Sequence, residues 1–447
     1  MEKNQAKLVR KYIGVGSLAL TGILYIISGI AFLVWRTKVP PLVQFIIVGY
    51  AVLLTITSLL ACFSKFTVTR LIRAFMPAIF GVLFLVFINQ MSTIYAFFIG
   101  IYIVLVGLIK FIDYILQRAN KTPGRSMVLL TAIIIIVIGL PLFLNPKTHI
   151  GSALVFTGIF CLFYGFTILG DFFVEVSPIK QTNRFKKRMR VNLPVFLTML
   201  MPKKAISYIN NLLATDDDGV IEEESFKVDK VPDIEIFVHV TEKGFGTIGH
   251  SDFYFEGKVY CYGNYDDSSL KLFGSIGDGV LFTTTDRDRY IKFCAKTTGD
   301  SIFAFGLSLT ELQKQAIRDR IKELFTHVIP WESKLKRYEE GTYQSEKEPD
   351  DYASKLYKET HAEMYKFKDT SFKAYFVLTT NCVKLVDYVI RSTGLAAANP
   401  NGIMSPGAYY EFFDRQYRLK NSIVISKQTY HHDATIEHEN KEDVPID

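Results

Sequence analysis

Long apolar runs fill the first 175 residues of this 447-residue chain and become rare afterwards. A helix needs about 20 apolar residues to cross a bilayer. Six segments are long enough, and they predict an all-helical membrane domain over residues 1–175. We place the spans near residues 14–35, 41–62, 72–90, 92–116, 126–145 and 150–174.

Basic residues alternate between the loops that join these spans. One set of loops is rich in Lys and Arg, at residues 3–11, 65–73, 118–125 and 180–190. The opposite loops hold only Arg36, Lys38 and Lys147. Positive charge marks the cytoplasmic side of a membrane. We therefore expect an integral protein of a bacterial cytoplasmic membrane, with both termini and the soluble half in the cytoplasm.

Small residues recur along the spans in a hairpin pattern. Gly22 and Gly29 mark an odd-numbered span, while Gly100–Gly107 and Gly158–Gly165 mark two even-numbered ones. Three helical hairpins of this kind predict a bundle packed through small residues. Over roughly residues 10–175 the chain resembles the HdeD-type (DUF308) six-helix membrane family, and the resemblance implies the same triple hairpin.

The few charged residues inside the spans, Lys110, Asp113 and Asp171, lie near helix ends. An ion or proton path through the bundle is one interpretation. Snorkelling or pairing at the interface is the other, and it is the one we favour. The membrane half is therefore expected to anchor or sense rather than to pump.

Residues 176–230 form a basic juxtamembrane linker that ends in an acidic loop. Its Lys and Arg side chains predict contact with anionic lipid headgroups, although topology determination alone explains them equally well. Residues 191–213 have the mixed apolar pattern of a helix lying on the bilayer surface. The tail over residues 431–447 has no apolar pattern and is expected to be disordered.

Residues 231–430 are typical of a soluble α+β domain. The Glu256-Gly257 turn between two β-prone runs predicts a hairpin. A helix is expected over 310–325 and a charged segment over 332–370. We expect strands near residues 234–240, 249–255, 258–266, 279–285, 288–294 and 301–306.

A cysteine opens a predicted helix late in the chain. A β-prone run ends at Thr379-Thr380-Asn381. Thr380 or Asn381 is a plausible helix cap, and Cys382 then falls in the first helical turn. The partial positive charge of a helix N-terminus favours a thiolate over a thiol. Cys382 is therefore a candidate nucleophile, provided that a base reaches it. The alternative is a small buried core residue.

His250 is the best candidate for that base. It begins a strand directly after a Gly-rich turn, whereas His431, His432 and His438 lie in the tail and His239 reads as structural. A histidine on a strand facing a cysteine on a helix is the geometry of papain-type hydrolases. Here the histidine precedes the cysteine, as in circularly permuted versions. The alternative is a hydrogen-bonded core histidine.

Several segments occur in an order that resembles the DUF4105 group of bacterial permuted papain-like domains. They are the Gly249-His250 strand, the arm 259–265, the stretch 277–280, the helix start 307–313 and Asn381-Cys382. The resemblance covers roughly residues 235–395. Broader relatives are NlpC/P60 and lecithin:retinol-acyltransferase-like hydrolases and acyltransferases. The resemblance implies that Cys382 is the nucleophile and His250 the base.

A third group is expected to orient the histidine. Tyr260, Tyr262 and Asn264 share one face of the neighbouring strand, because side chains alternate with period two. Cys261 falls on the other face with Val259. We expect Asn264 or Tyr262 to hold the imidazole.

These observations predict a membrane-tethered cysteine hydrolase or acyltransferase that acts on an amide, ester or thioester of a peptide or acyl substrate. The alternative is a non-catalytic membrane sensor or scaffold with a degenerate papain-like binding module. Transport through the bundle is a third, less favoured function. The five cysteines show no CxxC pairs, so we expect neither a metal nor a cofactor. The net charge of +7 lies largely beside the spans, so no nucleic-acid partner is expected.

Overall fold

A computed structural model describes residues 2–36, 38–64, 68–176, 230–240, 249–298, 301–393, 405–418 and 422–430. The chain forms two compact units, described separately below. One comprises residues 1–111 and 126–170, and the other residues 112–125 and 171–447. The predicted basic linker with its surface helix and the predicted disordered tail lie outside the described residues.

The described residues between 2 and 176 are mainly helical. Three described segments are long and apolar enough to cross a membrane, namely Gln90–Ala119, Arg125–Leu144 and Ile150–Gly170. The apolar stretches Leu18–Val34 and Gln44–Leu59 are shorter. A helical N-terminal region with three membrane-capable helices is thus confirmed. The helices are α1 (Glu2–Val34), α2 (Val39–Ser64), α3 (Val68–Val86), α4 (Ile88–Ala119), α5 (Arg125–Leu144) and α6 (Ile150–Val176).

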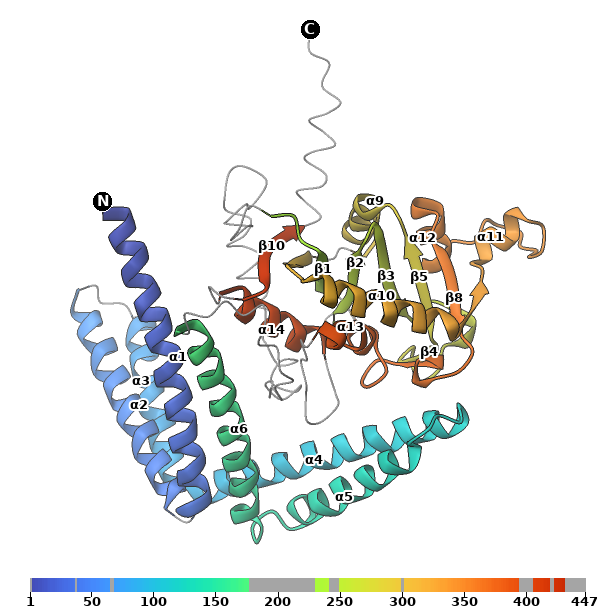
Figure 1. Cartoon of the computed structure of the whole chain (residues 1–447). Coiled ribbons are helices and arrows are strands. Elements are labelled where there is room, and N and C mark those ends of the chain that lie inside the picture. The colour runs from blue at the N-terminus through green and yellow to red at the C-terminus, as the bar shows by residue number, and fades with distance from the viewer. Residues whose placement is uncertain are drawn as a thin grey trace. The chain divides into compact units, whose positions relative to one another are not determined.

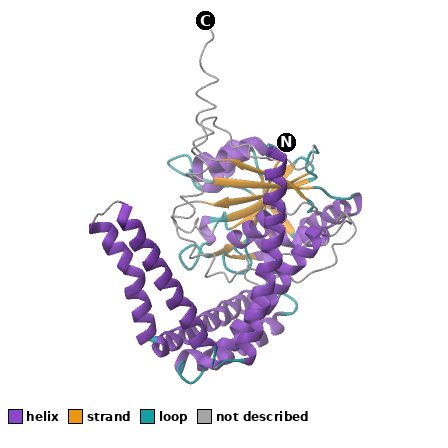
Figure 2. Cartoon of the chain, turned by 90° about the vertical axis from the view of Figure 1, so that its left-hand side faces the viewer, coloured by secondary structure: helices purple, strands orange, loops and turns teal. Residues whose placement is uncertain are grey.

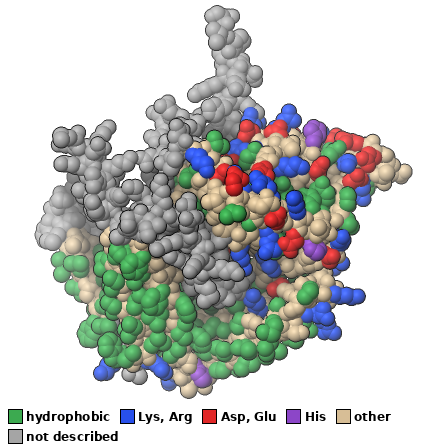
Figure 3. Space-filling view, viewed as in Figure 1, with side chains coloured by type: hydrophobic (Ala, Val, Ile, Leu, Met, Phe, Trp, Pro, Cys, Tyr) green, Lys and Arg blue, Asp and Glu red, His purple; other side chains and the backbone are tan. Residues whose placement is uncertain are grey.

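These helices pack through the small residues of the repeat. A Cβ atom added to Gly29 of α1 would lie 2.9 Å from the carbonyl oxygen of Gly158 in α6. One added to Gly100 of α4 would lie 2.5 Å from the backbone nitrogen of Phe143 in α5. Neither approach leaves room for a larger side chain. On the face seen in Figure 3, apolar side chains gather over these helices, whereas charged side chains are spread over the C-terminal domain.

The charged residues inside the predicted spans are only partly described. Asp113 is buried, and one of its oxygens accepts a hydrogen bond from Gln117 Nε2 at 3.2 Å. This contact lies one helical turn away on the same helix, as expected of a local structural pair. The side chain of Asp171 lies outside the described part of the chain.

A twisted antiparallel sheet forms the centre of the C-terminal domain (Figure 2). Its eight strands run in the order β10-β6-β1-β2-β3-β5-β8-β7. A two-stranded sheet of β4 and β9 lies at one end of the domain (Figure 1). The strands are β1 (Ile234–Val240), β2 (His250–Phe255), β3 (Lys258–Gly263), β4 (Ile276–Asp278), β5 (Val280–Thr284), β6 (Ser301–Leu307), β7 (Val328–Trp331), β8 (Glu363–Phe367), β9 (Ala374–Phe376) and β10 (Val424–Tyr430).

Helices cover both faces of the sheet because its strands are apolar on both. In β2, Phe253 and Phe255 join one hydrophobic core and Tyr254 joins the other, as strand alternation requires. The first core is completed by α10 (Glu311–Thr326), α13 (Cys382–Ile390) and α14 (Pro406–Arg418), the second by α9 (Arg287–Phe293) and α12 (Tyr352–Thr360). The short helix α11 (Lys334–Glu339) packs against α12.

Most of the predicted strands of this domain are present, including the hairpin of β2 and β3, which turns at Glu256-Gly257. The strand predicted over 288–294 is wrong, because α9 occupies it and continues as a π-helix over Cys294–Thr298. Asp286 caps α9 by accepting a hydrogen bond from the Arg289 backbone N–H at 3.0 Å. This cap, together with burial of Tyr290, Ile291 and Phe293 on one side, overrides the β propensity of the run.

Candidate active site

Cys382 is the first residue of α13, as its sequence context predicts. Asn381 caps the helix, since its Oδ1 accepts a hydrogen bond from the Lys384 backbone N–H at 3.1 Å. Its Nδ2 donates to the Val377 carbonyl at 2.9 Å, which ties the cap to the turn before it. Helix α13 packs against β2 and β3. The sulfur is therefore held at a helix N-terminus next to the strand that carries His250.

His250 is the first residue of β2, and the glycine before it fixes its position. Gly249 has φ +82°, and a Cβ atom there would lie 2.6 Å from the His239 carbonyl oxygen and 3.0 Å from Pro406. A larger side chain fits neither the backbone conformation nor the space. The turn therefore brings His250 close against β1 and the start of α14, with its side chain one quarter exposed.

Cys382 and His250 shift each other's pKa in opposite directions. Burial raises the pKa of the Cys382 thiol, but the charge of His250 and hydrogen bonding to its ring lower it, and the net pKa is below the usual thiol value. Burial lowers the pKa of His250, but the charge of Cys382 and hydrogen bonding to it give a net pKa above the usual value. The two shifts belong to one coupled pair and favour a thiolate beside an imidazolium.

Two further groups stabilise a negative charge on the sulfur. Hydrogen bonding of the Ser251 backbone N–H lowers the pKa of Cys382, as does that of the Tyr375 hydroxyl, which lies 3.9 Å from Sγ. Burial holds the pKa of Tyr375 well above its usual value, so this hydroxyl keeps its proton at neutral pH. Both groups therefore act as donors to the thiolate.

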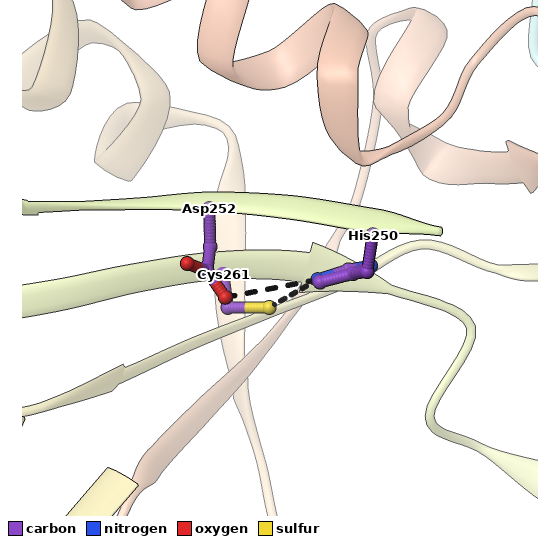
Figure 4. Close-up of side chains that lie close together, drawn as sticks. All are labelled: His250, Asp252 and Cys261. Carbon is purple, nitrogen blue, oxygen red and sulfur yellow. Dashed lines mark hydrogen bonds and ion pairs between the residues drawn. The ribbon is translucent and has the colours of Figure 1, made fainter. Parts of the chain in front are cut away.

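The Nε2 atom of His250 lies close to a second thiol. It is 2.8 Å from Cys261 Sγ and 3.9 Å from Asp252 Oδ2, as Figure 4 shows. The Tyr265 hydroxyl lies 2.9 Å from the same sulfur and 3.4 Å from Nε2. Burial and then the charge of Asp252 raise the pKa of Cys261 well above the usual value, so Cys261 is a neutral thiol. Its sulfur can accept a hydrogen bond from the Nε2–H group of His250.

Asp252 links this pair to the core of the domain. Its Oδ2 is 3.0 Å from His239 Nε2 and accepts a hydrogen bond from the Tyr290 hydroxyl. Asp252 and His239 are both buried. The carboxylate is thus fixed by groups from β1 and α9, and its negative charge raises the pKa of His250.

The structure places the two residues expected to orient the histidine elsewhere. Asn264 donates from Nδ2 to the Gly274 carbonyl at 2.7 Å, and Tyr262 donates to the Phe372 carbonyl at 2.8 Å. Among the described residues, neither side chain forms a hydrogen bond with His250, although the ring of Tyr262 contacts that of Tyr375. The groups found at Nε2 are Cys261, Tyr265 and Asp252. Asp252 could have been predicted as a neighbour of His250 from the sequence, because it lies two residues later and therefore shares its strand face.

His250, Asp252 and Cys261 also form a candidate metal-ligand set, since their ligand atoms all lie within 4.8 Å of one another. A tetrahedral zinc ion would separate a ligating nitrogen and sulfur by about 3.5 Å, given Zn–N of about 2.0 Å and Zn–S of about 2.3 Å. The observed separation of 2.8 Å is that of a hydrogen bond between the two groups. These positions therefore fit a hydrogen-bonded imidazole better than a zinc centre.

The comparisons concern the membrane half. Residues 72–144, which run from α3 to the end of α5, match the family model DUF308, described as a short repeat of unknown function. The match bears out the resemblance of the N-terminal region to DUF308 proteins. With the three membrane-capable helices it indicates a membrane protein. No curated protein and no solved structure matches the chain.

Replacing Cys261 with valine is expected to slow alkylation of Cys382 at pH 7 several-fold. Valine has a similar volume but offers Nε2 no acceptor, so the ring of His250 loses the contact that fixes its orientation. Cys261→Ser, which keeps an acceptor, is expected to retain most of the rate. The measurement is the alkylation rate of Cys382 as a function of pH. An unchanged profile in the valine variant would show that other contacts orient His250.

Proposed function

We propose that the C-terminal domain is a papain-like cysteine hydrolase or acyltransferase of permuted chain order, tethered to a membrane by the N-terminal helices. One observation carries the proposal. The thiol at the start of α13 and the imidazole at the start of β2 belong to two elements that pack against each other, and the pKa of each shifts in the direction that favours an ion pair. Such a pair is the activated state of a cysteine nucleophile.

The proposed chemistry starts with attack of the Cys382 thiolate on the carbonyl carbon of an amide, ester or thioester. The tetrahedral intermediate collapses when His250 gives its proton to the leaving amine, alcohol or thiol, and a thioester to Cys382 remains. Water, or an acceptor amine or hydroxyl, then attacks this thioester while His250 takes up its proton. Release of the acid or transferred product returns the thiolate–imidazolium pair.

The start of α13 offers donors for the oxyanion of this intermediate. The first backbone N–H groups of a helix have no partner within the helix. The backbone N–H of Lys384, the third residue of α13, donates a hydrogen bond to the Asn381 side chain. We assign stabilisation of the oxyanion to the backbone N–H groups at the start of α13 that precede Lys384, beside the Cys382 sulfur.

The membrane half is proposed to be a six-helix bundle of three hairpins. Six helices between residues 2 and 176, the DUF308 match over 72–144 and the glycine contacts between α1 and α6 and between α4 and α5 support it. The alternation of basic loops supports cytoplasmic termini and a cytoplasmic C-terminal domain. Such a location favours a substrate in the cytosol or at the inner membrane surface.

Acylation of Cys382 tests the proposal. The full chain, in lipid nanodiscs, is exposed briefly to p-nitrophenyl acetate at pH 7, quenched in acid and mapped by peptide mass spectrometry. The proposal predicts an acetyl thioester on Cys382 that forms before any on Cys261 or Cys294 and that disappears on further incubation. Absence of this adduct would favour the non-catalytic sensor or scaffold. Its control is Cys382→Ser, in which no thioester forms at this position.

A further inference from the structure

One exposed loop of the C-terminal domain holds apolar side chains out into solvent. We call residues 270–275 the apolar tip loop. Phe273 is 95% exposed, the largest value among the big apolar side chains of the described residues, including those on the apolar helices. Leu272 is 58% and Leu270 40% exposed. A concentration of this kind at one place marks an interaction site.

The apolar tip loop is a closed turn with a fixed base. Lys271 and Ile276 bond each other through both backbone N–H groups, at 2.8 and 3.2 Å. The Gly274 carbonyl accepts a hydrogen bond from Asn264 Nδ2 at 2.7 Å, and Ser275 Oγ donates to the Leu272 carbonyl at 2.7 Å. The backbone at the base of the loop is therefore well bonded, and the side chains at its tip point away from the domain.

The backbone at the tip is strained. Leu272 has φ +47° and Phe273 φ +57°, followed by Gly274 at φ +81°. L-residues with a bulky side chain rarely adopt this left-handed conformation, which suits Gly and Asn. Two large apolar residues at these positions lower the stability of the fold, because their backbone is strained and their side chains are exposed to water. Strain of this kind gathers at functional positions.

We propose that the apolar tip loop inserts into the interfacial region of the bilayer to which the chain is tethered. The membrane-capable helices of the same chain keep a bilayer within reach. Phe and Leu are the side chains that enter the boundary between headgroups and acyl chains. Lys271, exposed beside the tip, makes no ion pair with any described residue, so its ammonium can meet a lipid phosphate.

The base of the loop connects the bilayer contact to the candidate active site. It continues into β4, which pairs with β9, and β9 carries Tyr375, whose hydroxyl lies 3.9 Å from the Cys382 sulfur. Insertion of the tip would hold Cys382 near the membrane surface. The inference does not depend on Cys382 being catalytic, and its test reads lipid contact alone.

A single tryptophan reporter tests the insertion. Trp35 and Trp331, the two native tryptophans, are replaced by phenylalanine, and Phe273→Trp is added. The full chain is reconstituted into vesicles of phosphatidylethanolamine and phosphatidylglycerol, with or without bromine on the acyl chains. We expect blue-shifted emission that loses most of its intensity in the brominated vesicles. The matched control is Leu312→Trp in the same background, because Leu312 on α10 is 85% exposed and is expected to stay unquenched.

Two outcomes would overturn the inference. Red-shifted emission at Phe273→Trp without quenching would place the tip in water. Blue-shifted emission without quenching would place it against protein, such as a second copy of the chain. Circular dichroism of each variant confirms that the fold is retained.

Discussion

Cys382→Ala is expected to lower the protein-dependent hydrolysis of p-nitrophenyl acetate at least about a thousandfold, the scale of loss seen when a nucleophile is removed. The expectation follows from the surroundings of this sulfur, because Cys382 is the one thiol of the described residues whose net pKa lies below the usual value. The measurement is the initial rate with the full chain in nanodiscs.

Cys294→Ala is the matched control for this variant. Cys294 is buried in the same domain, and burial raises its pKa, so it is a poor nucleophile at pH 7. Its removal is expected to leave the rate unchanged. Equal activity of wild type and Cys382→Ala would mean that the measured hydrolysis occurs elsewhere on the chain and that Cys382 is not the nucleophile.

His250→Asn is expected to slow alkylation of Cys382 at pH 7 at least about tenfold, because an ordinary thiol is only a few per cent ionised at this pH. Without the imidazole, burial raises the pKa of Cys382 and its largest opposing contribution is gone. The difference in alkylation rate between variant and wild type is expected to shrink as the pH rises above the pKa of Cys382 in the variant, since both proteins then carry a thiolate. Rates of iodoacetamide labelling from pH 5 to pH 10 give this comparison.

His327→Asn controls for the loss of a histidine. His327 lies in the same domain, where Nδ1 is 2.7 Å from Asp369 Oδ1 at the surface. The variant is expected to label Cys382 at the wild-type rate throughout the pH range. If His250→Asn also behaved as wild type, the imidazole would not be the group that lowers the pKa of Cys382.

Local signals explain what could be predicted for the candidate site. The start of α13 could be predicted because the cap is local: Asn381 accepts a hydrogen bond from the backbone N–H of Lys384, three residues away. The start of β2 could be predicted because Gly249, directly before it, permits a left-handed backbone conformation. The proximity of Cys382 and His250, more than a hundred residues apart, followed from a resemblance in segment order rather than from any local pattern.

Local sequence patterns did not predict all the groups that contact His250. Strand alternation correctly put Tyr262 and Cys261 on opposite faces of β3, and they lie in different cores. Period-two spacing puts Asp252 on the strand face of His250, but it does not indicate that Cys261 and Tyr265 meet the same Nε2 atom, because that depends on how β2 and β3 pair. Similarly, the Asp286 cap of α9 competed with a β-prone run, and tertiary burial decided between them.

Packing within the membrane half was predictable to a similar degree. The glycine repeat indicated close helix contacts, and Gly29 and Gly100 show them. Helix length and hydropathy identify three helices that reach across a bilayer, whereas the proposed six spans also rest on the repeat itself.

The pH dependence of Cys382 alkylation in the wild-type chain tests the central claim most directly. The rate follows the thiolate, so a lowered pKa keeps Cys382 reactive well below the usual thiol pKa of about 8.5, and reactivity is lost only as the pH falls through the lowered value. We predict a rate whose inflection lies below the usual thiol pKa, because the pKa of Cys382 is lowered by His250. A rate that rises through a single inflection at or above about pH 8.5 would contradict the thiolate–imidazolium pair.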